Sequence, residues 1–409
     1  MLHRIWLFFF LAAFAGGLYQ WLWLDDAEVF QRLVQSTFDM SKLSVELAIG
    51  LIGTLAFWLG IMKLAEAAGL IDKLARVLTP LFTRLMPDLP PRHPAIGSMT
   101  MNLSANMLGL DNAATPLGLK AMQDLQSLNP QKDTASNAQI LFLVLNTSSV
   151  TLFPITVFLY RAQQGAANPT DVFIPILIAT ACSTLAGLLA VSWVQKIQLW
   201  DRITLLYLGG FAAVLLASVA YFSTLAVDEL QRQSSLIGNL LIFSIIIFFL
   251  VSAHRKGVNI YETFIEGAKQ GFNVAIMIIP YLLAMLVAIG VLRASGALDG
   301  FVWLLREGVA LFGLDTRFAE ALPTAIMKPL SGSGARAMML ETMHSQGVDS
   351  FAAHVASIIQ GSTETTFYVL AVYFGSVGIR HTRHAVACGL TADLAGIIAA
   401  IVCGYWFFG

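Results

Sequence analysis

The sequence predicts an all-α polytopic membrane protein, with about nine transmembrane helices, two broken or re-entrant segments and two inverted-topology repeats. Composition is the first reason: 57% of the 409 residues are hydrophobic and 12% are charged, whereas soluble domains carry roughly 25% charge. Long uncharged runs that recur along the chain are the second reason. The third is a pair of short polar strings, which stand at matching places in the two halves inside apolar stretches.

Most of the predicted transmembrane helices are uncharged runs close to the ~20 residues that cross a bilayer. The first run ends in Trp21 and Trp23 without an A-x-A cleavage site, so we interpret it as a retained helix; a cleavable signal peptide is the alternative. Glu46 and Lys63 flank the short second run and can extend to the membrane surfaces. The predicted runs are Ile5–Leu24, Leu47–Met62, Ile140–Tyr160, Val172–Val194, Ile203–Val227, Ser234–Ala253, Phe272–Leu292, Phe351–Ile379 and Ala385–Phe408.

Two further segments, Pro94–Asp124 and Pro323–Met343, are half apolar and are interrupted by Gly, Pro and clustered polar residues. We expect each to be a helix, a break and a second helix. Non-helical backbone is tolerated at membrane depth only where it is buried in protein or lines a cavity, and paired interrupted segments indicate a transporter's binding site. The alternative is a polar surface loop with amphipathic flanks.

The two halves repeat one order of segments: an entry helix, an amphipathic segment, a broken segment and a span with a polar string. An odd number of membrane crossings separates the two entry helices, so the halves are expected to run in opposite directions through the membrane. The predicted units are an N-terminal helix with its connector (1–45), a first repeat (46–200), linking helices (201–260) and a second repeat (261–409).

Charged residues and cysteines exclude several classes of protein. The net charge of −1 gives no reason to expect a nucleic-acid partner. The three cysteines stand in apolar surroundings and form no C-x-x-C pair, so neither a disulfide framework nor a zinc site is predicted. Most basic residues between spans fall on one side if the N-terminus is cytoplasmic, as the positive-inside rule requires. Three arginines fall on the other side and count against this orientation: Arg293, Arg306 and Arg317.

The polar strings are the strongest candidates for a binding site. If the second string is helical, Gln360, Thr363, Glu364 and Phe367 share one face at i, i+3, i+4 and i+7 spacing. An amide, a hydroxyl, a carboxylate and an aromatic ring suit a small, polar, partly planar solute. The first string offers neutral hydrogen-bonding groups, and its candidates for substrate binding are Asn146, Ser149 and Thr151. For the side chains of both strings, hydrogen bonding between helices is the alternative.

The two breaks add candidate ligands for charged groups. Ser331 and Ser333 lie where backbone N–H groups at the start of a half-helix could face an anion, and Arg336 in the next turn could hold a carboxylate. A structural pair with Glu364 is the alternative for Arg336. Asp111 and Asn112 occupy the equivalent break, where they, with Glu364, could coordinate Na⁺ or relay a proton; a helix cap is the alternative for Asp111.

Three motifs resemble a known group of membrane proteins. The segments Gln360–Gly375 and Pro329–Arg336 resemble spore maturation protein B, and Asn106–Met122 resembles spore maturation protein A. The chain is similar to a natural fusion of the two from about Glu46 onward. The resemblance implies a Gate, or nucleoside-recognition, protein of the bacterial inner membrane, similar in parts to concentrative nucleoside transporters and to the membrane part of ferrous-iron permeases. It implies more about the fold than about the transported solute.

The leading functional hypothesis is a secondary transporter of a small polar metabolite, nucleoside-like or carboxylate-bearing, coupled to H⁺ or Na⁺. No nucleotide-binding motif, nucleophile–base pair or H-E-x-x-H string is present, so we predict no cofactor, no metal site and no enzymatic activity. The expected partners are the solute, the coupling ion, the lipid bilayer and, as an option, a second copy of the chain.

Two alternatives stay open. The first is a divalent-metal permease; no cluster of His, Cys, Asp and Glu at ligand spacing in the sequence supports it. The second is a non-transporting membrane scaffold or regulator, whose function would survive neutralisation of Glu364 and Arg336.

Overall fold

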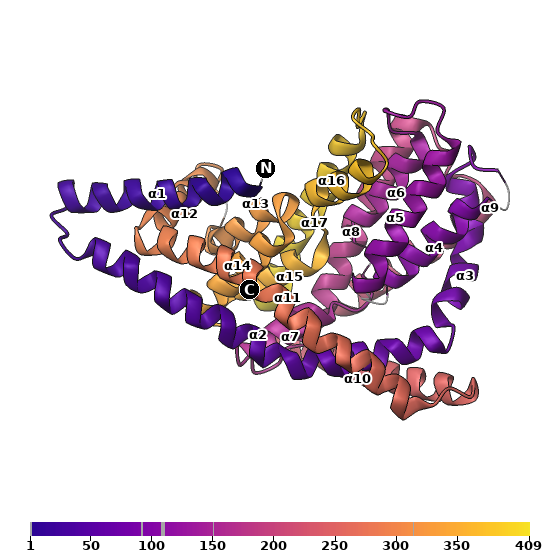
Figure 1. The fold of residues 1–409 in the computed structure, drawn as a ribbon, viewed down its shortest axis with the longest axis horizontal. Helices are drawn as coiled ribbons and strands as arrows, with labels where there is room; N and C mark the ends of the chain where they lie inside the picture. Colours follow the sequence, from indigo (N-terminus) through magenta and orange to yellow (C-terminus); the bar gives the residue numbers. More distant parts are fainter. Residues whose placement is uncertain (1, 91–92, 108–110, 150, 314) are drawn as a thin grey trace.

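The computed structural model describes residues 2–90, 93–107, 111–149, 151–313 and 315–409 (Figure 1). Side chains are described in these ranges except at positions 2, 3, 111–113, 227, 228, 275, 277 and 278. The described chain is built from helices, joined at one place by an isolated β-bridge between Thr134 and His381. The predicted all-α class is therefore confirmed.

In the described part of the chain, seven helices are long and apolar enough to cross a membrane, so the chain is a multi-pass membrane protein. Two of them, α2 and α11, are the first long helices of the two halves, and Figure 1 shows α10 and α11 beside α2 along one edge of the molecule. The seven are α1 (Leu2–Trp23), α2 (Val29–Ala67), α8 (Phe173–Gln195), α9 (Arg202–Phe222), α10 (Val227–Arg255), α11 (Ile260–Ala294) and α17 (Ala385–Phe408).

Shorter helices fill each half in the same order. After a long helix, a glycine in the left-handed conformation starts an amphipathic helix: Gly69 has φ 70° and Gly296 has φ 69°, which glycine adopts at little cost. Two pairs of short helices follow in each half. The first half has α3 (Leu70–Leu85), α4 (Pro94–Met107), α5 (Asp111–Leu128), α6 (Asn137–Thr147) and α7 (Ile155–Gln163). The second has α12 (Ala297–Ala310), the 3₁₀ turn η1 (Arg317–Ala321), α13 (Leu322–Leu330), α14 (Gly332–Gln346), α15 (Phe351–Ser362) and α16 (Thr366–Ser376).

Equivalent long helices of the two halves run antiparallel to each other. Near one end of the pair, Gly60 of α2 lies against the Phe264 ring of α11; toward the other, Gly290 of α11 lies against Met40. The pair α8 and α17 is antiparallel too, because Gly187 of α8 lies against Ala392 of α17, whereas Gly396, further along α17, lies against the earlier residue Ser183 of α8. Opposite directions of equivalent helices are what an inverted repeat produces.

Two of the predicted continuous spans are wrong. The run Ile140–Tyr160 is divided between α6 and α7, and Phe351–Ile379 is divided between α15 and α16. The first interruption leads into Pro154, which has no N–H to donate and disfavours a helical residue before it. The second is a run of Ser and Thr, whose hydroxyls compete for backbone hydrogen bonds. Both polar strings are therefore helix breaks.

Of the two predicted broken segments, one is confirmed and the other falls partly outside the described residues. Ser331 separates α13 from α14 in an extended conformation (φ −158°, ψ 115°), so the break in Pro323–Met343 is confirmed. In Pro94–Asp124 the structure describes α4 and α5, and the residues between them, 108–110, lie outside the described part of the chain. The division into four units stays a prediction; its first boundary, at 45/46, falls inside α2.

Candidate functional site

The two polar strings meet each other across the interior of the molecule. The backbone N–H of Glu364, in the break between α15 and α16, donates to the carbonyl of Thr147 at the end of α6, at 2.8 Å. Ser149, in the break between α6 and α7, has a left-handed backbone (φ 50°), an uncommon conformation for a residue other than glycine that is concentrated at functional sites. The two breaks thus form one irregular, hydrogen-bonded core.

Each break is supported by the long helix that follows it. Thr180 of α8 directs its hydroxyl to the carbonyls of Ser148 and Ser149, at 3.3 Å for the former. In the other half, the Asp393 carboxylate of α17 accepts a hydrogen bond from the Thr366 hydroxyl at 2.6 Å. Polar groups at corresponding places in α8 and α17 therefore satisfy backbone and hydroxyl groups that the interrupted helices leave open.

The third break adds cationic groups. The Ser331 hydroxyl accepts a hydrogen bond from the N–H of Gly334 at 3.1 Å and so caps α14. Lys328, at the end of α13, is 2% exposed, and its ammonium donates to the carbonyl of Gln360 at 2.8 Å. Lys328 is not among the predicted site residues, although a lysine beside a proline in an apolar segment is a signal that the sequence carries. The Arg336 guanidinium lies 5.4 Å from the centroid of the Tyr160 ring, a cation–π distance.

Two adjoining cavities, of about 790 and 80 Å³, lie where these breaks converge. Both are lined by Gly332, Arg336 and Glu364, and the Glu364 side chain is exposed. Of the other predicted site residues, the larger cavity is lined by Asn146, Ser331, Ser333 and Phe367, and the smaller by Ser149, Thr151 and Gln360. Most of the predicted substrate-binding residues are thus brought together at these two cavities.

One predicted residue does not line these cavities, and the side chains of two others are not described. Thr363 lines neither of them and is 1% exposed. Asp111 and Asn112 are the first residues of α5, but their side chains lie outside the described part of the structure. Ala114 and Thr115, in the same turn of α5, line the larger cavity. The proposed ion-coupling role of Asp111 and Asn112 therefore stays a prediction.

One predicted arrangement is wrong. Gln360, Thr363, Glu364 and Phe367 do not share a continuous helical face, because α15 ends at Ser362 and Thr363 is extended (φ −140°, ψ 169°). Instead, Gln360 belongs to one half-helix, Phe367 to the next, and Glu364 lies in the break between them. Extended backbone here lets Glu364 reach both cavities.

A wall of amides and one phenol completes the larger cavity. Asn146 Oδ1 accepts from Asn106 Nδ2 at 2.9 Å and from the Tyr373 hydroxyl at 3.4 Å. Asn102 Nδ2, in turn, is 3.3 Å from that hydroxyl and 2.7 Å from the carbonyl of Ala114. This network joins α4, α5 and α6 to α16, so it crosses from one repeat to the other. Sequence reasoning found Asn146 but assigned no role to Tyr373.

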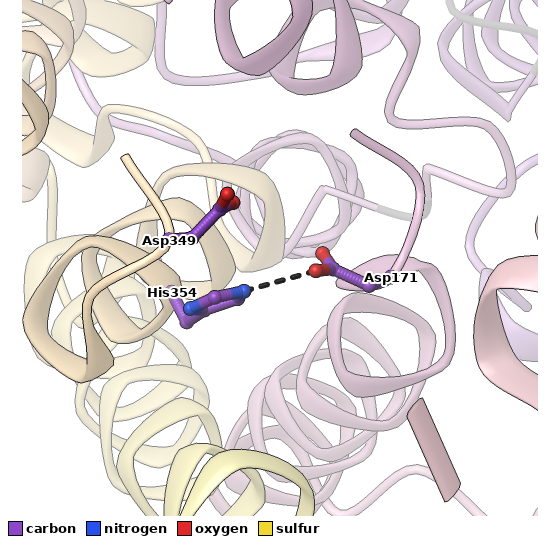
Figure 2. A group of neighbouring side chains, drawn as sticks. All are labelled: Asp171, Asp349 and His354. Carbon is purple, nitrogen blue, oxygen red and sulfur yellow. Dashed lines mark hydrogen bonds and ion pairs between the residues drawn. The ribbon is translucent and has the colours of Figure 1, made fainter. Parts of the chain in front are cut away.

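A second polar cluster, drawn in Figure 2, contributes no residue to the lining of either cavity. Its ligand atoms lie within 4.8 Å of one another and belong to Asp171, Asp349 and His354. Asp171 is far from the other two in the sequence, so no local pattern predicts the group. The guanidinium of Arg161, which is fully buried, occupies their centre. Its Nη2 atom is 3.1 Å from Asp171 Oδ1, 3.3 Å from Asp349 Oδ1 and 3.1 Å from His354 Nε2. A cation of the chain itself therefore occupies the place that a metal ion would take.

Comparison with known proteins identifies the family. The profile of the Gate family, described as nucleoside recognition, matches residues 48–163 and 275–380, more than half of the chain. The chain belongs to this family. Each matched segment contains one of the two helix breaks that meet at the cavities, so the matches to the Gate family cover the core of the candidate site.

Two curated relatives correspond to the two halves of this Gate protein. Spore maturation protein A of Bacillus subtilis (strain 168) is 42% identical over 159 residues, which are 39% of this chain and 81% of the relative. Spore maturation protein B of the same organism is 47% identical over 154 residues, 38% of this chain and 85% of the relative. The resemblance to a fusion of these two proteins is confirmed.

Proposed function

We propose that this Gate protein is a secondary transporter of the bacterial inner membrane, with a cytoplasmic N-terminus, which carries a small polar solute and is coupled to H⁺ or Na⁺. The observation that supports this most strongly is the pair of cavities where helix breaks from both repeats converge. Inverted repeats with interrupted helices around a central site allow that site to open to either side of the membrane in turn.

Glu364 is the residue on which the proposal depends most. Its backbone joins the two repeats, and its carboxylate lines both cavities. A carboxylate at this position can hold a donor group of the solute and, by gaining or losing a proton, can link solute binding to proton movement. The side chain therefore serves as the candidate for substrate binding and for ion coupling together.

The metal-permease alternative gains no support from the described cavity lining, in which Glu364 is the single carboxylate and neither His nor Cys occurs. Divalent cations bind to sets of several such ligands. The group of Asp171, Asp349 and His354 provides such a set, but the Arg161 guanidinium already forms ion pairs with both carboxylates.

A thermal-shift screen of the purified chain tests the proposal. The panel holds nucleosides, di- and tricarboxylates, amino acids, pyridine carboxylates and divalent metals, each at two pH values. At least one solute class is expected to raise the melting temperature, because a ligand that binds the folded state selectively stabilises it. Glu364→Gln should weaken that binding by roughly tenfold or more, since it removes a charged hydrogen-bonding partner.

Glu46→Gln is the matched control, because the Glu46 side chain on α2 is 59% exposed and lies outside both cavities. It should bind the solute as the unmodified chain does. Uptake of the solute into proteoliposomes, with an imposed pH or Na⁺ gradient, then tests transport and coupling. A folded chain that binds nothing in the panel, or binds equally well after Glu364→Gln, would contradict the proposal and favour the scaffold alternative.

A further inference from the structure

The junction between the two cavities is built from groups that suit one kind of solute. We infer that the solute carries a carboxylate, which binds at the N-terminus of α14 beside Arg336, while its hydrogen-bond donors face Glu364. This inference rests on the proposed function and narrows it, because it selects a carboxylic acid over a neutral nucleoside.

The start of α14 is the first step in the argument. The opening residues of any helix lack a preceding carbonyl within the helix to receive their N–H groups, and the aligned peptides give this end a partial positive charge. Ser331 satisfies the N–H of Gly334 through its side chain and that of Ala335 through its carbonyl. Gly332 and Ser333 precede these residues, and both line the larger cavity. A carboxylate placed there can accept N–H donors.

Thr365 is an independent sign of a ligand at this place. It is 2% exposed and lines the larger cavity, and its hydroxyl has no hydrogen-bond partner among the described residues. That hydroxyl would lie 2.8 Å from a Cβ at position 332, so it is adjacent to the first residue of α14, where glycine leaves the space open. A buried donor without a partner is costly, and a bound carboxylate oxygen would satisfy it.

Charge supports the same assignment. In the described lining, Lys328 and Arg336 carry positive charge, and Glu364 alone carries negative charge. Arg336 follows Gly332 by one helical turn, so its guanidinium lies beside the N-terminus of α14, and the Tyr160 ring restrains it on the other side. A guanidinium binds a carboxylate through two parallel hydrogen bonds between opposite charges, whereas a neutral nucleoside offers it only uncharged acceptors.

The opposite wall suits the rest of such a solute. Glu364 and the amide of Asn146 line the larger cavity together with the rings of Phe367 and Tyr368. The Glu364 carboxylate can accept a hydrogen bond from an amine or hydroxyl of the solute, and the two rings can pack against its apolar or planar part. At about 790 Å³, the cavity holds a solute of metabolite size.

Matched acid and amide pairs test the inference on the full chain. The probes are nicotinate and nicotinamide, and succinate and succinamide, measured by thermal shift and by calorimetric titration. We expect the acid of at least one pair to bind roughly tenfold or more tightly than its amide. Arg336→Gln should abolish that preference, Arg336→Lys should retain part of it, and Thr365→Val should weaken acid binding several-fold.

Arg232→Gln is the control, because the Arg232 side chain is 77% exposed, pairs with Glu229 and lines neither cavity. The comparison of acid with amide needs no variant, so it decides the matter even if Arg336→Gln does not fold. If the amides bind as well as their acids, or if nucleosides bind and no acid does, the inference that the solute carries a carboxylate is wrong. The proposed transport function would still stand. Absence of binding by acids, amides and nucleosides alike would overturn both.

Discussion

Replacing Arg161 by alanine is expected to lower the free energy of unfolding by about 3–5 kcal/mol, the typical cost of removing one partner from a buried ion pair. Arg161 is fully buried on α7, and its guanidinium bridges Asp171 at the start of α8 to Asp349 and His354 at the start of α15. Removing it leaves the Asp171 carboxylate, whose side chain is 11% exposed, without its cation, while Asp349 is 44% exposed and keeps contact with water. Thermal or denaturant unfolding of the purified chain in detergent measures the loss.

Two comparisons make this prediction specific. Arg232→Ala removes an exposed arginine with a similar carboxylate partner and should change the stability little. Adding Asp171→Asn to Arg161→Ala should recover part of the lost stability, because it removes one of the uncompensated charges. Equal stability of Arg161→Ala and Arg232→Ala would show that the cluster does not hold the two repeats together.

Gly271→Val is expected to destabilise the chain by about 1–3 kcal/mol through overpacking. A Cβ at Gly271 of α11 would lie 2.3 Å from the Cα and 2.4 Å from the N of Ala56 on α2, so backbone would have to move. The long helices α2 and α11 would separate at this contact, and a lower melting temperature should report it. Gly209→Val on α9 is the control, because a Cβ there meets nothing within 4 Å. Similar melting temperatures for the two variants would refute a close approach of α2 to α11.

Much of the fold could be predicted because lipid imposes simple rules. Long apolar runs identified α1, α8, α9, α10, α11 and α17 as membrane helices, and Gly and Pro indicated the break at Ser331. The breaks inside the polar strings escaped prediction, because hydropathy registers how apolar a run is and not whether its backbone is helical. At Thr363 the outcome depends on support from elsewhere: a carbonyl of Thr147 receives the next N–H, and Asp393 receives the Thr366 hydroxyl.

The sequence predicted those candidate site residues that are polar and stand inside long apolar runs. Glu364, Gln360 and Asn146 stood out against apolar neighbours, and they line the two cavities. Lys328 was overlooked because a lysine near a helix end is ordinary, and only the fold shows that it is 2% exposed. Arg161 was overlooked for a different reason: Asp349 and His354 follow it by almost half the chain, and such distant partners leave no local pattern.

The cavities draw on both repeats, and this has a consequence for how the site assembles. Asn146 and Asn106 come from the first half, whereas Ser331, Arg336 and Glu364 come from the second, so neither half holds a complete lining. In this chain, α9 and α10 connect the halves covalently. The two halves therefore associate within one molecule, at an effective concentration that the connecting helices set. Their association does not depend on protein dilution, and the two halves are always present in equal numbers. Cutting the chain between α9 and α10 would make the completeness of the site depend on concentration.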